Sequence, residues 1–152
     1  MKGERIMITK KQDINKYCCL YVSDFHLEMI LLPFIKNKMQ NSEILIFTQK
    51  DLSTSIKILL EKINLNNESK NNILNIKNWN NKYIDEINNL NNKEYTIIIN
   101  GDEKYRNSIN EKMNNLAINV INIIDCYDIN NTCIKEYEIN NKYKCILNTG
   151  NI

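Results

Sequence analysis

The stretch at residues 17–50 constrains the fold more than any other part of the sequence. Its large apolar side chains recur at helical spacing and give one apolar face to a helix: Leu27, Ile30, Leu31, Phe34 and Ile35. A short continuous apolar run follows at residues 44–47, which is typical of a strand buried on both faces. A helix that covers a buried strand predicts an α/β domain.

The alternation of strand and helix continues along the chain. Strands are expected at residues 17–22, 44–47, 73–76, 95–99 and 120–124. Further helical stripes are expected at residues 56–63, 79–90 and 105–116. This order predicts a three-layer sandwich with a mainly parallel sheet. Residues 143–147 are expected as a final edge strand, with an antiparallel direction as one alternative.

Three segments give weaker signals. Pro33 falls inside the first helical pattern, where it is expected to kink the helix or divide it. Residues 4–9 fit either an edge strand or an ordered arm. Residues 129–142 are polar, and one short helix around residues 134–139 is expected there.

Length and composition predict a single domain over residues 1–152. The hydrophobic fraction is 43%, and no run approaches the roughly 18 apolar residues that cross a bilayer. The N-terminus is charged and lacks the apolar segment of a secretory signal. We therefore expect a cytoplasmic protein with no membrane partner.

Charge and cysteine content bear on two further functional classes, nucleic-acid binders and metal-binding proteins. The formal net charge is +2, and the basic start of the chain has no aromatic platform or helix-turn-helix pattern beside it, so no nucleic-acid partner is expected. The five cysteines have no C-x-x-C spacing, and the chain has one histidine. We expect reduced thiols, no metal site and no cofactor.

Ligands of open α/β sheets bind beyond the carboxyl ends of the strands, so functional residues are sought there. The expected strand ends supply Asp24 and His26, then Gln49, then Asp102, and finally Asp128. An acidic group of this kind fits Mg²⁺ or a basic ligand, but Asp and Glu also occur at helix starts for reasons of the helix dipole. Both interpretations remain open, as do a base or phosphoacceptor role and a helix-flank role for His26.

No enzyme motif is found in the sequence. A P-loop needs G-x-x-x-x-G-K-[ST] between strand and helix, and the turn at residues 48–53 has no glycine, so no ATP binding is expected. Cys126 is a candidate reactive thiol, but no second histidine is present to activate it. A small enzyme that uses the acidic strand ends and Cys126 is therefore the second hypothesis.

Three segments resemble the MEDS family of sensory domains, which is similar in fold to RecA-type P-loop ATPases that have lost the P-loop. The first segment is residues 19–47, with CLY, then PFI in an apolar helix, and the strand ILIF. The others are the turn at residues 101–103, and the turn at residues 126–128 together with the closing CILNTG. Where the family usually has a histidine before its first strand, this chain has Lys16.

The resemblance implies a freestanding, non-catalytic sensory or regulatory domain in bacterial signalling. It would act by binding a small ligand or a protein partner, with a histidine kinase or a transcriptional regulator as the expected partner class. If the sheet is RecA-like, its former nucleotide crevice is the expected binding site. The residues expected to border that crevice are Tyr21, Asp24, His26, Gln49, Asp102, Tyr127 and Asp128. The alternative is a filled crevice and an interaction through the helix surface around Pro33.

Overall fold

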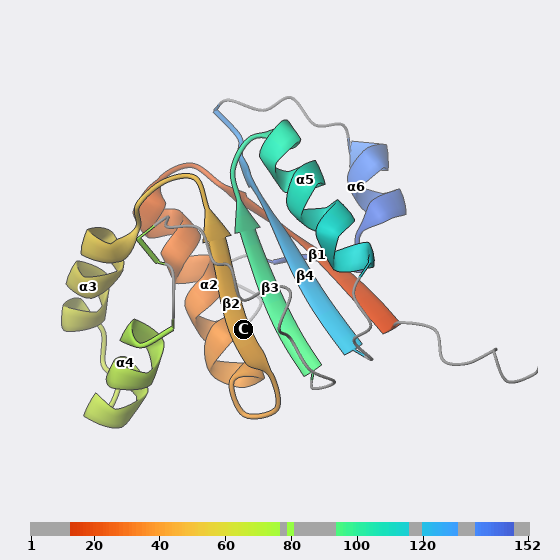
Figure 1. The fold of residues 1–152 in the computed structure, drawn as a ribbon. Coiled ribbons are helices and arrows are strands. Elements are labelled where there is room, and N and C mark those ends of the chain that lie inside the picture. The colour runs from red at the N-terminus through yellow and green to blue at the C-terminus, as the bar shows by residue number, and fades with distance from the viewer. Residues whose placement is uncertain (1–12, 77–78, 81–93, 116–119, 131–135, 148–152) are drawn as a thin grey trace, which may run out of the picture.

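The computed structural model describes residues 13–76, 79–80, 94–115, 120–130 and 136–147 (Figure 1). Its centre is a five-stranded, all-parallel sheet. In chain order the strands are β1 (Asp13–Tyr21), β2 (Glu43–Thr48), β3 (Glu94–Asn100), β4 (Val120–Asp128) and β5 (Cys145–Leu147). Their order across the sheet is β2-β3-β4-β1-β5. The predicted α/β class with a mainly parallel sheet is confirmed.

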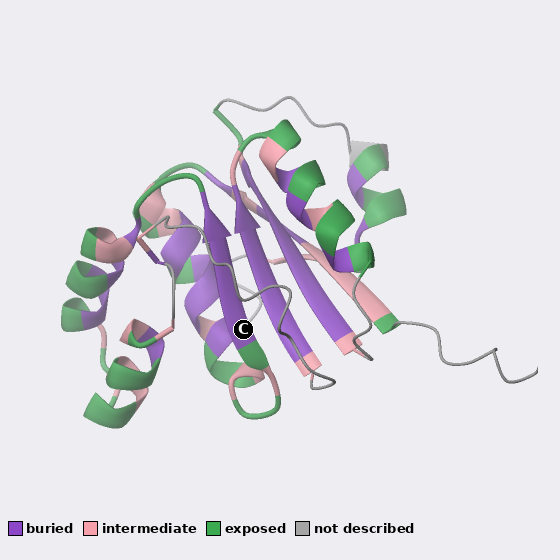
Figure 2. Cartoon of the chain, in the orientation of Figure 1, coloured by how far each residue is buried: buried purple, intermediate pink, exposed green. Residues whose placement is uncertain are grey.

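Helices cover both faces of this sheet (Figure 1). One face carries α2 (Asp24–Lys38), with α3 (Ser53–Lys62) and α4 (Asn67–Leu74) packed against it. The other face carries α5 (Glu103–Asn114) and α6 (Glu136–Lys142). The strands β2, β3 and β4 are buried along almost their whole length (Figure 2), because a parallel sheet between two helix layers has no face open to water.

The edge strand β5 corrects one sequence-based alternative. It pairs with β1 in parallel, with Cys145 opposite Tyr17 and Leu147 opposite Cys19. The antiparallel direction is therefore wrong. The connection through α6 provides the crossover that a parallel strand requires.

The helix α2 begins at a conventional cap and runs past Pro33 without division. The hydroxyl of N-cap Ser23 accepts a hydrogen bond from the backbone N–H of His26 at 3.2 Å. Pro33 leaves the carbonyl of Met29 without its helical donor, but Met29 is half exposed, so this side of the helix is open to water. The predicted division of the helix at Pro33 is wrong.

Residues 73–76 do not form the expected strand. Ile73 and Leu74 instead end α4, and the polar residues before them supply the rest of that helix. Its N-cap is Asn66, whose side-chain oxygen accepts from the backbone N–H of Ser69 at 2.7 Å. Local capping therefore decides the structure here, because only Ile73 is buried.

Two strands are longer than predicted. β1 begins at Asp13 rather than residue 17, and β4 continues to Asp128 rather than ending at residue 124. The added residues 13–16 of β1 pair with residues 120–123 of β4, and the added residues 125–128 of β4 pair with residues 18–21 of β1. The two strands therefore extend each other at both ends.

Some expectations lie outside the described residues. These are the segment at residues 4–9, most of the helix expected at residues 79–90, and Cys133. Trp79 itself is described and lies in a turn. Among the described helices, none combines the length and apolar character needed to cross a bilayer.

Candidate functional site

The carboxyl edge of the sheet holds six of the seven residues that the sequence predicts for the crevice. Tyr21 ends β1, Asp24 and His26 lie in the first turn of α2, Gln49 follows β2, Asp102 caps α5, and Asp128 ends β4. Parallel strands bring their carboxyl ends to one edge, which is why these distant residues come together.

A buried line of hydrogen bonds connects three strands at this edge. The hydroxyl of Tyr21 donates to Asn100 Oδ1 at 2.7 Å, and Asn100 Nδ2 donates to Thr48 Oγ1 at 3.1 Å. The pKa of Tyr21 is raised because the phenol is buried and lies close to Cys126, Asp128 and Asp24. The phenol therefore stays neutral and acts as a hydrogen-bond donor.

Gln49 and Asp102 bind to each other and fix the start of α5. Gln49 Oε1 accepts from the backbone N–H of Asp102 at 2.7 Å, and Asp102 Oδ1 accepts from the backbone N–H of Tyr105 at 2.8 Å. The buried guanidinium of Arg106 donates to the carbonyl of Gly101 at 2.6 Å. These polar atoms position the loop after β3.

The loops after β1 and β4 are also joined. The backbone N–H of Ile129 donates to the carbonyl of Tyr21 at 3.0 Å, and Asn130 Nδ2 donates to the carbonyl of Val22 at 3.1 Å. His26 Nδ1 accepts from the N–H of Val22 at 2.9 Å. The ring of His26 thus closes the turn that starts α2.

Asp24 forms an ion pair with Lys50 that links the start of α2 to the loop after β2. The distance from Asp24 Oδ2 to Lys50 Nζ is 3.1 Å, and the Lys50 side chain is 64% exposed. An exposed pair of this kind contributes little to stability, about 0–1 kcal/mol. It does place one cation and one anion at the edge where a ligand would bind.

Tyr127 does not join the other six residues. The sequence placed it in a loop, whereas the structure places it within β4, on the face covered by α5 and α6. Its hydroxyl lies 2.6 Å from that of Tyr143, which donates to Asp125 Oδ2 at 2.7 Å. Arg106 lies over its ring, 3.9 Å from the centroid. Tyr127 therefore belongs to a core polar network on the opposite face from Tyr21.

Asp125 is the centre of that network and explains why β4 does not end there. It is fully buried and receives hydrogen bonds from Tyr143 and from Asn110 Nδ2, and Lys16 Nζ lies 3.3 Å from Oδ2. Burial lowers the pKa of Lys16, and the nearby Asp125 carboxylate opposes that shift. A buried carboxylate with these partners is stable inside a strand.

The thiol of Cys126 is fully buried in β4 and faces α2. Burial and a hydrogen bond with Cys19 raise the pKa of Cys126 well above its ordinary value. Burial likewise raises the pKa of Cys18 to about 12. Both groups are therefore thiols rather than thiolates at neutral pH.

Glu28 is a candidate functional residue that sequence reasoning missed. It lies in α2, is fully buried, and its Oε2 accepts a short hydrogen bond from Ser55 Oγ in α3. Its Oε1 has no hydrogen-bond partner within the described part of the chain. Burial raises the pKa of Glu28 to about 7, the Ser55 hydrogen bond opposes this, and Asp24 adds to it.

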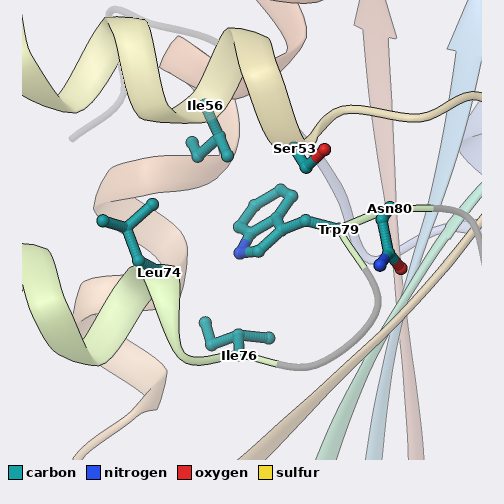
Figure 3. A pocket seen from close by; sticks show the side chains of 6 residues that line it. All are labelled: Ser53, Ile56, Leu74, Ile76, Trp79 and Asn80. Carbon is teal, nitrogen blue, oxygen red and sulfur yellow. The ribbon is translucent and has the colours of Figure 1, made fainter.

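A cavity beside Trp79 is a second feature that sequence reasoning missed. Its volume is about 160 Å³, and Figure 3 shows the residues that line it: Ser53, Ile56, Leu74, Ile76, Trp79 and Asn80. The indole ring lies among Ile56, Leu74 and Ile76, while Ser53 lies above the ring and Asn80 lies to its right (Figure 3). Most of these residues are only half-buried, so the cavity opens at the surface.

Two backbone contacts hold Trp79 in place. Its indole N–H donates to the carbonyl of Ile73 at 2.9 Å, and its own carbonyl accepts from the N–H of Leu52 at 2.7 Å. The ring is therefore fixed between the end of α4 and the start of α3. The one signal in the sequence was that Trp79 is the chain's single tryptophan.

Comparison with known proteins adds no relative. No family model, curated protein or solved structure matches the chain.

Proposed function

We propose that the chain is a non-catalytic sensory or regulatory domain that binds a small ligand. The observation that carries this proposal is the cavity at Trp79. It combines a fixed aromatic ring, three apolar side chains and two polar side chains, which is the composition typical of small-molecule sites. The proposed relationship to MEDS domains, RecA-like without a P-loop, is supported by the all-parallel sheet between two helix layers.

The size and lining of the cavity favour one ligand class. A cavity of about 150 Å³ accommodates a benzene ring, and this one has about 160 Å³. Ser53 Oγ donates its hydrogen to Asp51 Oδ1 at 2.6 Å, so its lone pairs are directed to accept. The nearby Asp51 carboxylate disfavours an anionic ligand. A neutral single-ring compound with a hydroxyl donor fits these conditions.

The fluorescence of the single tryptophan tests the proposal directly. Phenol should change the emission of wild-type protein in a saturable way. Ile76→Phe should abolish this change, because the added ring fills the cavity. Ile58→Phe is the matched control, since Ile58 lies on α3 outside the cavity lining and is 38% exposed. Equal responses of both variants, or none in wild type, would contradict the proposal.

In this proposal ligand binding changes the interaction of the domain with a protein partner in the cytoplasm. The partner is a histidine kinase or a transcriptional regulator. The second hypothesis, a small enzyme that uses Cys126, receives less support. The thiol is fully buried with a raised pKa, and Asp24 and Asp102 are engaged with Lys50 and with the first turn of α5.

A further inference from the structure

The contact between Glu28 and Ser55 joins the two helices α2 and α3 at a buried point. Glu28 is fully buried, so its carboxyl oxygens have no contact with bulk water. Ser55 Oγ has a single hydrogen and two acceptors within reach: Glu28 Oε2 and the carbonyl of Leu52 at 3.3 Å. When Glu28 is ionised, the hydroxyl donates to the carboxylate, and the Leu52 carbonyl accepts only from the backbone N–H of Ile56, at 3.0 Å, among these two donors.

Addition of one proton to Glu28 changes this arrangement. The carboxyl Oε2–H then donates to Ser55 Oγ, and the serine hydrogen is released to donate to the carbonyl of Leu52. Both hydrogen bonds are made at once, and the buried Oε1 no longer carries charge without a partner. Burial of the charge at Oε1 therefore favours the protonated state, whereas the Ser55 hydrogen bond, which is stronger to a charged acceptor, favours the ionised state.

Leu52 and the residues after it connect this contact to the cavity. The N–H of Leu52 donates a hydrogen bond to the carbonyl of Trp79 at 2.7 Å, and Ser53 and Ile56 of the same helix turn line the cavity. We propose that Glu28 is a proton-binding site whose occupancy sets the hydrogen bonds of the first turn of α3, and with them the wall of the Trp79 cavity. The regulation of ligand binding rests on the proposed function, whereas proton binding at Glu28 does not.

The surroundings of Glu28 fit a response near neutral pH. Burial raises its pKa to about 7, and the charged group that adds to this shift is Asp24, one helical turn earlier and paired with Lys50. From α3 the group that faces it is Ser55, whose hydrogen bond acts in the opposite direction. His26, the single histidine, lies in the same first turn of α2, so a variant of His26 serves as a control.

A ligand-free titration of Trp79 fluorescence against pH tests this inference. Wild-type emission should change with a midpoint near pH 7, and Glu28→Gln should remove the transition while the protein stays folded by circular dichroism. Glu61→Gln, an exposed glutamate of α3, and His26→Gln should both keep it. A transition that persists in Glu28→Gln, or that disappears in His26→Gln, would overturn the inference.

Ser55→Ala gives a second, directional test that does not depend on the glutamine variant. Loss of the Ser55 hydroxyl removes the hydrogen bond that lowers the pKa of Glu28, so the midpoint of the transition should move to higher pH. An unchanged or lower midpoint would contradict the role assigned to this pair. Because no ligand is present, these results stand apart from the phenol titration. Failure of phenol to bind would count against the proposed function alone.

Discussion

The hydroxyl of Tyr21, at the end of β1, donates a 2.7 Å hydrogen bond to Oδ1 of Asn100, at the end of β3. β4 lies between these two strands, so the bond spans a full strand of the sheet. It crosses the region predicted from the sequence as a crevice. At this point a side-chain hydrogen bond joins the ends of β1 and β3.

Substitution Tyr21→Phe should lower the free energy of unfolding by about 1 kcal/mol, because it removes this bond and leaves a buried amide oxygen of Asn100 unpaired. Urea unfolding measures the change. Tyr105→Phe is the control, since Tyr105 lies in α5 outside this hydrogen-bonded line. A Tyr21→Phe variant as stable as wild type would show that the bond contributes nothing.

Gly101→Ala should destabilise the protein because of a steric conflict. A Cβ at this position would lie 2.5 Å from Cδ2 of Tyr105 and 2.6 Å from Oε1 of Gln49. Displacing Gln49 breaks its bond to the N–H of Asp102, so the expected loss is about 1–3 kcal/mol.

A double-mutant cycle with Gln49→Ala checks this cause. Shortening Gln49 removes one of the two close contacts, so Gly101→Ala should cost less in the Gln49→Ala background than in wild type. Equal costs in both backgrounds would assign the whole effect to Tyr105.

Reactivity with an aromatic disulfide reagent should separate the thiols. Cys145 is exposed, whereas Cys18, Cys19 and Cys126 are buried. Cys145→Ser should therefore remove one equivalent of rapid reaction in the native protein, and Cys126→Ser should leave the rapid phase unchanged. Loss of rapid reaction in Cys126→Ser would instead revive the thiol-enzyme hypothesis.

We expect no saturable binding of a fluorescent ATP analogue. The turns after β1 and β2, at residues 22–23 and 49–52, contain no glycine, and a phosphate-cradling loop needs that freedom. A P-loop ATPase serves as the positive control. Micromolar, saturable binding would contradict the expectation.

The buried strands were predictable because their signal is local. The strands predicted at residues 44–47 and 95–99 correspond to the observed strands Glu43–Thr48 and Glu94–Asn100. Apolar side chains on both faces fit only a strand between helix layers. The end of β4 was not predictable. Asp125 signals a loop by itself, and its partners Lys16 and Tyr143 come from distant parts of the chain.

The strand-end residues of the candidate site followed from the sheet rule, but their mutual contacts did not. Glu28 was missed because a glutamate in a helix usually faces water. The overlooked signal was that Leu32 and Ile35, one and two turns later, lie on the same side of α2 and are buried too. A glutamate on this buried side of α2 therefore has no exposed position to occupy.

The pairing of β1 has a consequence for the synthesis of the protein. Within the described part of the chain β1 pairs with β4 and β5, and both follow it in the sequence after β2 and β3. A ribosome therefore makes β1 before either partner exists. The apolar residues of β1 must remain unpaired until β4 is made, which exposes the nascent chain to aggregation. The described sheet is complete only when β5 has been made.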